Sequence, residues 1–130
     1  MEEMKVTFYS EDSEPVNLKC EVAKSFFAKM KGMMYRESLQ EERGMIFPFL
    51  VPWYKSFWMK NVKIPLDIIF VNRKFKIITI YEAPVKQGFF HKIYWSWGFC
   101  KYVIECNMGF CKKRGITKGD RIEIKKTLKK

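Results

Sequence analysis

Residues 57–70 form a mostly apolar run that contains Lys60, Asn61 and Asp67. A run of this kind is typical of a buried strand, where an unpaired polar amide costs roughly 2–7 kcal/mol. Polar side chains in such a strand must therefore be hydrogen-bonded, ion-paired or in contact with a ligand. We expect these three residues to mark a polar site inside an apolar wall of the fold.

The composition favours one domain. A chain of 130 residues, of which 48% are hydrophobic, can fill one core but has no room for a second. We expect a single domain over residues 1–130, with an acidic N-terminal strand segment and a Lys-rich C-terminal tail. No stretch reaches the roughly 18–20 apolar residues of a membrane span, and the N-terminus lacks the pattern of a signal peptide. The sequence therefore predicts a soluble, cytoplasmic protein without a membrane span.

The net charge of +11 is unevenly distributed along the chain. Residues 1–17 hold five acidic residues and one Lys, whereas residues 101–130 hold ten Lys or Arg and three acidic residues. A basic surface attracts polyanions over long distances. The expected partners are nucleic acid or a small anion, and a protein partner is the alternative. A Lys-rich surface that serves solubility alone would explain the same charge.

The four cysteines lack the spacing of a metal site or of a disulfide framework. The sequence contains no Cys-x-x-Cys, whereas zinc sites usually include closely spaced pairs. Cys100 and Cys106 fall in one expected strand, which separates them by about 20 Å at 3.3 Å per residue. We expect four free thiols, no metal site and no cofactor.

Short alternating runs separated by turn residues predict about eight strands. The expected strands cover residues 5–9, 16–22, 45–50, 56–60, 66–72, 75–82, 99–106 and 121–125, with a β-hairpin over 66–82. Pro48 confines its strand to an edge or a bulge, and Pro52 is expected to end it. Ser25 and Asn107 are typical N-caps and predict helices near residues 25–32 and 108–114. The expected fold class is α+β and mainly β: a small curled antiparallel sheet or barrel of about eight short strands with two short helices.

Several blocks of the sequence resemble one known family. They are Gly32-Met33-Met34-Tyr35-Arg36, Gly44-Met45-Ile46-Phe47-Pro48-Phe49, residues 57–67, Tyr102-Val103-Ile104-Glu105 and residues 115–121. In this order they are similar to the pattern of domain-of-unknown-function family 192, over roughly residues 15–125. The resemblance implies a compact β-rich barrel with helical additions, and it implies no particular activity. Residues 84–98 fall where the family is variable, so no function for them follows from the resemblance.

The first candidate site consists of polar residues in or beside these blocks: Arg36, Lys60, Asn61, Asp67 and Glu105. The two cations could hold an anionic group, and the two carboxylates could act as general acid and base. The alternative is structural, with Asp67 capping a turn, Glu105 paired with a cation and Asn61 bound to backbone groups. The sequence has no phosphate loop, no nucleophile elbow and one histidine, His91, so it favours binding over catalysis but leaves an enzyme open.

The second candidate site is a set of aromatic residues interleaved with lysines. It consists of Trp53, Phe89, Tyr94, Trp95 and Trp97, with Lys55, Lys86 and Lys92 between them. Aromatic faces flanked by cations suit single-stranded nucleic acid, where stacking contributes about 1–3 kcal/mol per base. They also suit a protein partner, because Trp and Tyr dominate interface hot spots. Alternatively, residues 84–98 fold back as a lid and bury these rings in the core.

Together, these features predict a binding module for an anionic ligand, either nucleic acid or a small phosphate- or carboxylate-bearing compound. Two alternatives stay open. One is a small hydrolase or lyase that uses Asp67 and Glu105. The other is a protein-interaction module that uses the aromatic loop 84–98.

Overall fold

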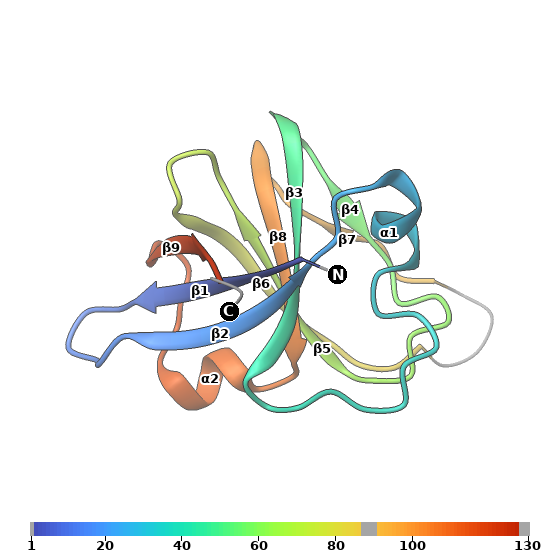
Figure 1. Cartoon of the computed structure of the whole chain (residues 1–130), viewed down its shortest axis with the longest axis horizontal. Coiled ribbons are helices and arrows are strands. Elements are labelled where there is room, and N and C mark those ends of the chain that lie inside the picture. The colour runs from blue at the N-terminus through green and yellow to red at the C-terminus, as the bar shows by residue number, and fades with distance from the viewer. Residues whose placement is uncertain (1, 87–90, 128–130) are drawn as a thin grey trace.

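The computed structural model describes residues 2–86 and 91–127, which form nine strands and two short helices (Figure 1). This confirms the predicted class, mainly β with two short helices. In chain order the elements are β1 (Glu3–Tyr9), β2 (Val16–Val22), α1 (Phe26–Lys31), β3 (Arg43–Trp53), β4 (Ser56–Phe57), β5 (Leu66–Val71), β6 (Ile77–Ala83), β7 (Tyr94–Trp95), β8 (Cys100–Asn107), α2 (Phe110–Arg114) and β9 (Arg121–Lys126).

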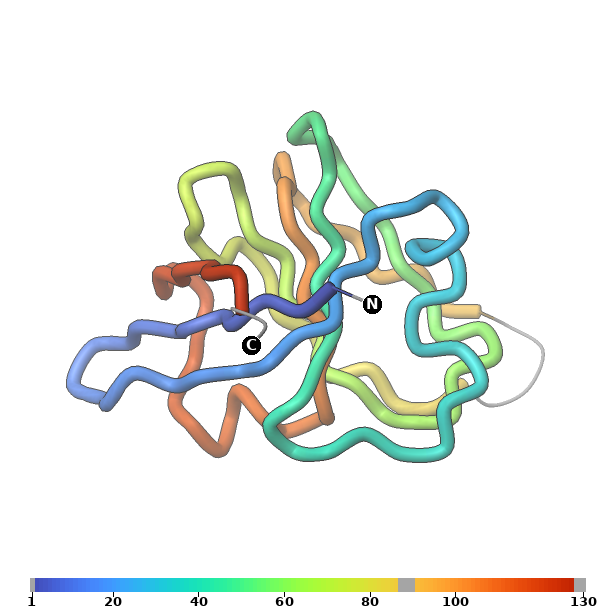
Figure 2. The backbone as a smooth tube through the Cα atoms, in the orientation of Figure 1, coloured from blue at the N-terminus to red at the C-terminus, as the bar shows by residue number. Residues whose placement is uncertain are grey.

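Seven of the strands form one curled sheet with the order β6-β5-β8-β3-β2-β1-β9. The first and last strands of this order approach each other, so the sheet curls into a half-barrel (Figure 2). The Ile77 N–H donates to the carbonyl of Asp120 at 2.9 Å, and the Ile122 N–H donates to the carbonyl of Phe75 at 2.9 Å. The two other strands, β4 and β7, pair with each other beside the main sheet.

One strand pair departs from the antiparallel sheet predicted from the sequence. Strands β2 and β3 are parallel, and their register pairs Lys19 with Arg43 and Val22 with Ile46. Parallel neighbours need a long crossover, which a tight turn cannot provide. Residues 23–42, including α1, supply that crossover, so the sheet is mixed.

Side chains of β3, β5 and β8 alternate between two hydrophobic cores, because successive residues of a strand point to opposite faces. Ile46, Ile69 and Ile104 belong to an inner core with residues of β1, β2, β9 and α2. The opposite face contributes Met45, Ile68, Phe47 and Val103 to an outer core. Segments beside α1, the residues around β4 and Tyr94 of β7 cover this outer core.

The two helices begin in different ways. The Ser25 hydroxyl accepts a hydrogen bond from the Ala28 N–H at 3.0 Å, as predicted for α1. Asn107 does not cap α2, because its side-chain amide donates to the carbonyl of Leu39 at 2.7 Å. Gly109 occupies the cap position with φ 91° and has no capping side chain of its own. The cap comes from Asp67 on β5.

Strand β3 continues beyond the point where the sequence predicts its end. It passes through Pro52 to Trp53, so Pro52 does not terminate it. The register between β3 and β8 shifts after Pro48, which is the irregularity predicted for that residue. Because β2 pairs with β3 only as far as Ile46, Pro48 lies where one edge of β3 has no neighbour in the main sheet and its missing N–H is tolerated.

All four cysteines are buried, and none is in a disulfide. Cys100 and Cys106 lie on β8, and burial raises the pKa of the Cys100 thiol to about 11. Burial also raises the pKa of Cys20 and Cys106 well above the ordinary range, so these thiols stay protonated at neutral pH. In the described part of the chain, no helix is both long enough and apolar enough to cross a membrane.

Candidate functional site

The structure does not bring Asp67 and Glu105 together. Asp67 of β5 pairs with Cys106 of β8, whereas Glu105 pairs with Ile68. Directly paired residues point to the same face and neighbouring residues to opposite faces. The carboxyl group of Asp67 therefore points to the inner core and that of Glu105 to the outer core. The two groups cannot act as acid and base on one substrate, as the hydrolase or lyase alternative requires.

Asp67 supports the start of α2. Its carboxylate is fully buried and accepts hydrogen bonds from the N–H groups of Gly109 at 3.1 Å and Cys111 at 2.9 Å. Burial raises the pKa of Asp67, and the hydrogen bonds from Cys111 and Gly109 oppose that rise. The carboxylate provides the helix with the partner that Gly109 lacks.

None of the other three polar candidates is hydrogen-bonded or ion-paired with Asp67 or Glu105. Arg36 forms an ion pair with Glu21 of β2. Lys60 is exposed, and its ammonium lies 5.2 Å from the ring centre of Trp58. Asn61 adopts φ 59° in a turn and donates to the hydroxyl of Tyr35 at 3.1 Å. The five predicted residues are therefore not linked by contacts with one another, apart from the strand pairing that carries Asp67 and Glu105.

The aromatic candidates divide between the surface and the core. Tyr94 is buried in the outer core, in the way expected for a loop that folds back. Trp95 and Trp97 are exposed. Trp53 is also exposed and stacks on Phe99 with ring centres 5.3 Å apart. Phe89 lies outside the described residues.

Glu105 is an almost completely buried residue whose carboxyl group has no partner in the described part of the chain. Only 4% of the residue is exposed, and no described side chain or N–H group donates a hydrogen bond to the carboxyl or forms an ion pair with it. Burial alone raises its pKa to about 8. At neutral pH the group is therefore mostly a neutral acid, which can donate one hydrogen bond and accept others.

The carboxyl group of Glu105 lines a pocket of about 330 Å³ between α1 and the outer face of the sheet. We call this the Glu105 pocket. Its walls are mainly apolar side chains: Phe26, Met30, Met33, Met34, Phe47, Phe49, Phe57, Trp58 and Val62. Gly32 lies close by, since a Cβ added there would be 3.8 Å from Oε1 of Glu105. An apolar pocket with few polar groups is typical of small-molecule sites.

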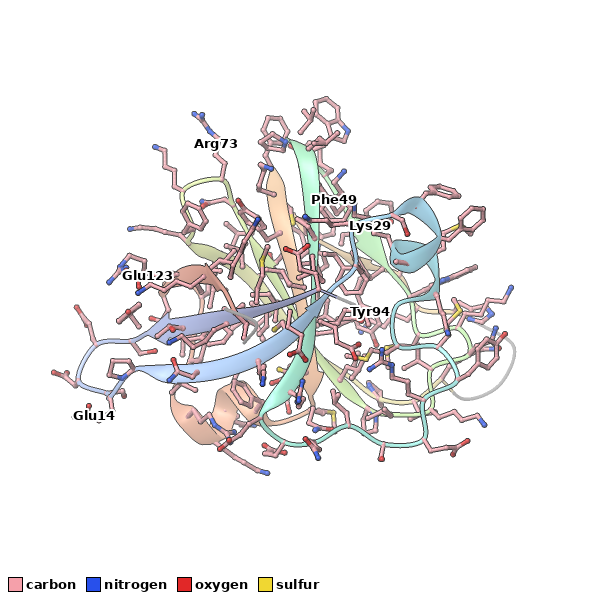
Figure 3. The ribbon with its side chains drawn as sticks, in the orientation of Figure 1. Glu14, Lys29, Phe49, Arg73, Tyr94 and Glu123 are labelled. Carbon is pink, nitrogen blue, oxygen red and sulfur yellow. The ribbon has the colours of Figure 1, made fainter. Side chains whose placement is uncertain are left out.

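Lysines gather beside the same pocket, around the ring of Phe49. The Lys29 ammonium lies 5.2 Å from the ring centre and that of Lys55 lies 4.3 Å from it. Figure 3 labels Lys29 and Phe49 next to each other, between α1 and β3. Lys101 donates to the backbone carbonyl of Phe49. Burial, followed by repulsion from Lys55 and Lys101, lowers the pKa of Lys29.

These lysines have no acidic partner among the described residues, although most ion pairs elsewhere on the protein are formed by lysine or arginine with glutamate. Lys29 donates to the carbonyl of Lys24 at 2.8 Å, which leaves its charge unneutralised. Three nearby cations without a carboxylate repel one another. An anionic group at the rim of the Glu105 pocket would relieve that repulsion.

A larger cavity, of about 620 Å³, is lined by Asp67 together with residues of β6 and α2. The Asp67 carboxylate already accepts hydrogen bonds from the N–H groups of Gly109 and Cys111 at the start of α2. Asp67 therefore offers a ligand in this cavity no unpartnered buried group. Among the described residues, no group of three or more His, Cys, Asp or Glu side chains could hold a metal ion. The Glu105 pocket is therefore the stronger candidate.

The comparison with known families decides the classification. The model of domain-of-unknown-function family 192, described as an uncharacterised ACR, matches residues 7–124. The chain belongs to this family. Four of the sequence blocks that resemble family 192 meet at the Glu105 pocket, through Met33, Phe47, Phe57 and Glu105.

Two solved structures resemble this member of family 192 over nearly its whole length. A candidate transcription regulator from Sinorhizobium meliloti 1021 is 30% identical with a TM-score of 0.86, over 93% of this chain and 92% of that one. A protein of unknown function from Novosphingobium aromaticivorans DSM 12444 is 34% identical with a TM-score of 0.82, over 92% of this chain and 83% of that one. No curated protein matched the chain.

Sequence reasoning identified Glu105 but missed its surroundings. The sequence places Glu105 with Arg36 and Lys60 in the first candidate site, and Lys55 with the aromatic residues of the second. Lys29 was not singled out, because a lysine on a short amphipathic helix is an ordinary solvent-facing residue. The available signal was the density of Met and Phe around Lys29 in residues 26–34.

Replacing Asp67 with Asn should destabilise the protein. An amide nitrogen cannot accept from a backbone N–H, so one buried donor of α2 loses its partner, at a cost of about 1–3 kcal/mol. Urea unfolding would measure the loss. Asp12→Asn is the matched control, because Asp12 is exposed in the turn after β1. Equal stability of Asp67→Asn and wild type would contradict the capping role.

Because the pKa of Glu105 is raised in the folded protein, the free energy of unfolding should fall as the pH rises. Its pKa is about 8 in the folded protein, against an ordinary value of 4.5. Between these values the folded state binds more protons than the unfolded state, so the free energy of unfolding decreases with pH, by up to about 1.4 kcal/mol per pH unit. Below pH 4.5 both states are protonated and the effect vanishes; above pH 8 both are ionised and it is constant.

The test is urea unfolding of wild type and Glu105→Gln at a series of pH values. The stability of Glu105→Gln relative to wild type should rise across this window, because the amide does not ionise. Glu42→Gln, which alters an exposed glutamate, should keep the wild-type profile. Parallel profiles for wild type and Glu105→Gln would show that Glu105 ionises normally.

Proposed function

We propose that the protein binds small amphipathic anions in the Glu105 pocket. The ligand class is a compound with an apolar body, a carboxylate or phosphate group at one end and a hydrogen-bonding group at the other. The observation that carries this proposal is the buried, unpartnered carboxyl of Glu105 inside an apolar pocket that has lysines at its rim.

Each part of the pocket would contact one part of the ligand. The aromatic and methionine walls would bury the apolar body, with roughly 25 cal/mol gained per Å² removed from water. Lys29 and Lys55 would contact the anionic group. The neutral acid of Glu105 would donate a hydrogen bond to a hydroxyl or carbonyl oxygen of the ligand. A buried polar group that lacks a protein partner gains most from a ligand that supplies one.

This proposal restricts the class of anionic ligand predicted from the sequence to small amphipathic molecules. Nucleic acid stays a second candidate, because Trp95 and Trp97 are exposed and the S. meliloti relative is described as a candidate transcription regulator. A pocket of about 330 Å³ suits a small molecule better than a nucleic-acid strand. An activity on the ligand would need a second catalytic group, and Asp67 does not reach this pocket.

Isothermal titration calorimetry with four probes tests the proposal: 8-hydroxyoctanoate, octanoate, 1-octanol and acetate. We expect 8-hydroxyoctanoate to bind most tightly, because it offers all three features of the ligand class. Octanoate should bind about five- to ten-fold more weakly, as expected for the loss of one hydrogen bond worth ~1 kcal/mol. Octanol should bind more weakly than 8-hydroxyoctanoate, and acetate should not bind measurably.

Three variants assign the contacts. Glu105→Leu should abolish the preference for 8-hydroxyoctanoate over octanoate, because the leucine fills the site without a donor. The double change Lys29→Ala and Lys55→Ala should weaken both anions, whereas Lys125→Ala, an exposed lysine on β9, should not. No heat with any probe, or acetate binding as tightly as octanoate, would refute the proposal. Tight, salt-dependent binding of a single-stranded oligonucleotide instead would favour the second candidate.

A further inference from the structure

Large apolar side chains gather at one end of the molecule, outside the Glu105 pocket. Leu50 is 97% exposed, Val51 is 66% exposed and Trp53 is 58% exposed. Tyr54 and Phe99 beside them are more than half exposed. We call these five residues the apolar tip. Isolated exposed apolar residues are common, but a contiguous set marks an interaction surface.

The apolar tip is an ordered part of the fold. The Trp53 ring stacks on Phe99 with ring centres 5.3 Å apart, and Tyr54 packs edge-on against Phe99 at 5.0 Å. Trp53 pairs with Cys100, so the end of β3 and the start of β8 hold the tip in place. In Figure 1 these strand ends project at the top of the view, beyond the edge of the sheet.

Cations surround the apolar tip, and acidic residues are missing from the segments that build it. Arg73 and Lys74, in the turn between β5 and β6, line a cavity together with Pro52, Tyr54 and Phe99. Figure 3 places Arg73 at the same upper end of the molecule. Lys55 directly follows Tyr54 in the sequence, and Lys101 lies two residues after Phe99. Residues 44–66, 68–81 and 83–104 contain no Asp or Glu.

We propose that the apolar tip docks on the surface of an anionic lipid bilayer. Leu50 and Val51 would enter the boundary between headgroups and acyl chains, with the rings of Trp53 and Tyr54 at headgroup level, where such amphipathic rings are favoured. Arg73 and Lys74, which line the cavity beside Tyr54 and Phe99, would contact anionic headgroups. Peripheral docking of this kind combines apolar insertion with electrostatic attraction and needs no membrane-spanning helix.

The chemistry of the tip favours a bilayer over other occupants. A nucleic-acid strand would stack on aromatic faces, but Leu50 and Val51 have none, and Trp53 and Phe99 stack on each other. A second copy of the chain would bring an equal charge of +11 to a basic surface, which opposes association. An anionic bilayer complements both the exposed aliphatic residues and the cations.

Co-sedimentation of the full chain with vesicles tests this inference. One set of vesicles consists of phosphatidylcholine alone, and the other contains one-third phosphatidylglycerol. We expect binding to the anionic vesicles that weakens with added salt, and at least ten-fold weaker binding to phosphatidylcholine. Tryptophan emission should shift to shorter wavelength on the anionic vesicles, because Trp53 leaves water.

Two pairs of variants assign the surface. The double change Leu50→Ser and Val51→Ser should lower the partition coefficient at least ten-fold, while Met108→Ser, an exposed residue at the other end of β8, should leave it unchanged. Arg73→Ala with Lys74→Ala should weaken binding and reduce its salt dependence. The same loss of charge through Lys112→Ala with Lys113→Ala on α2 should have a much smaller effect.

Several results would overturn the inference. They are no binding to anionic vesicles, undiminished binding by the Leu50/Val51 variant, and tip-dependent binding to single-stranded oligonucleotide in place of vesicles. Tip-dependent dimerisation without lipid would assign the surface to a second copy instead.

The inference is tested separately from the Glu105 pocket. The Leu50/Val51 variant should lose vesicle binding but bind 8-hydroxyoctanoate as wild type does.

Discussion

The alternation of side chains along β8 is the constraint on which the site depends. This strand lies between β5 and β3, so both of its edges are hydrogen-bonded, and its two faces contribute side chains to different cores. Ile104 and Cys106 face the inner core, whereas Val103 and Glu105 face the outer side. A shift of one residue in register would exchange these sets, which would place a carboxyl group in the inner core and two apolar residues in the pocket.

The two buried carboxyl groups show how the same residue type serves different purposes in different surroundings. Asp67 has two backbone donors and completes the start of α2, so its burial is compensated within the fold. Glu105 has no such donor among the residues that the structure describes, and burial raises its pKa to about 8. An uncompensated buried polar group lowers stability, and perturbed groups of this kind cluster at functional sites. In this protein the perturbed group lines an apolar pocket with lysines beside it, which is the basis of the proposed ligand class.

The parts of the fold that the sequence predicted are those set by local signals. Ser25 caps α1, and the hairpin of β5 and β6 follows from alternating apolar residues around Asn72, whose side chain accepts from the Lys74 N–H at 2.9 Å. The parallel pairing of β2 and β3, the capping of α2 by Asp67 and the pocket around Glu105 could not be predicted. Each depends on a register between segments that are distant in the sequence, and residue types alone do not specify that register. Glu105 could be recognised as a polar residue in a buried strand, but not as one without a partner.

The protonation state of Glu105 tests the proposed ligand class most directly. Carbon-13 NMR of the side-chain carboxyl groups across a pH titration, with Glu105→Gln to assign the resonance, would give its pKa in the folded protein. The midpoint should lie near 8, and it should rise once 8-hydroxyoctanoate is bound, because the bound hydroxyl stabilises the neutral acid. A midpoint near the ordinary value of 4.5 would mean that Glu105 is a carboxylate at neutral pH. In that case the pocket has no neutral donor, and the proposed ligand class would be wrong.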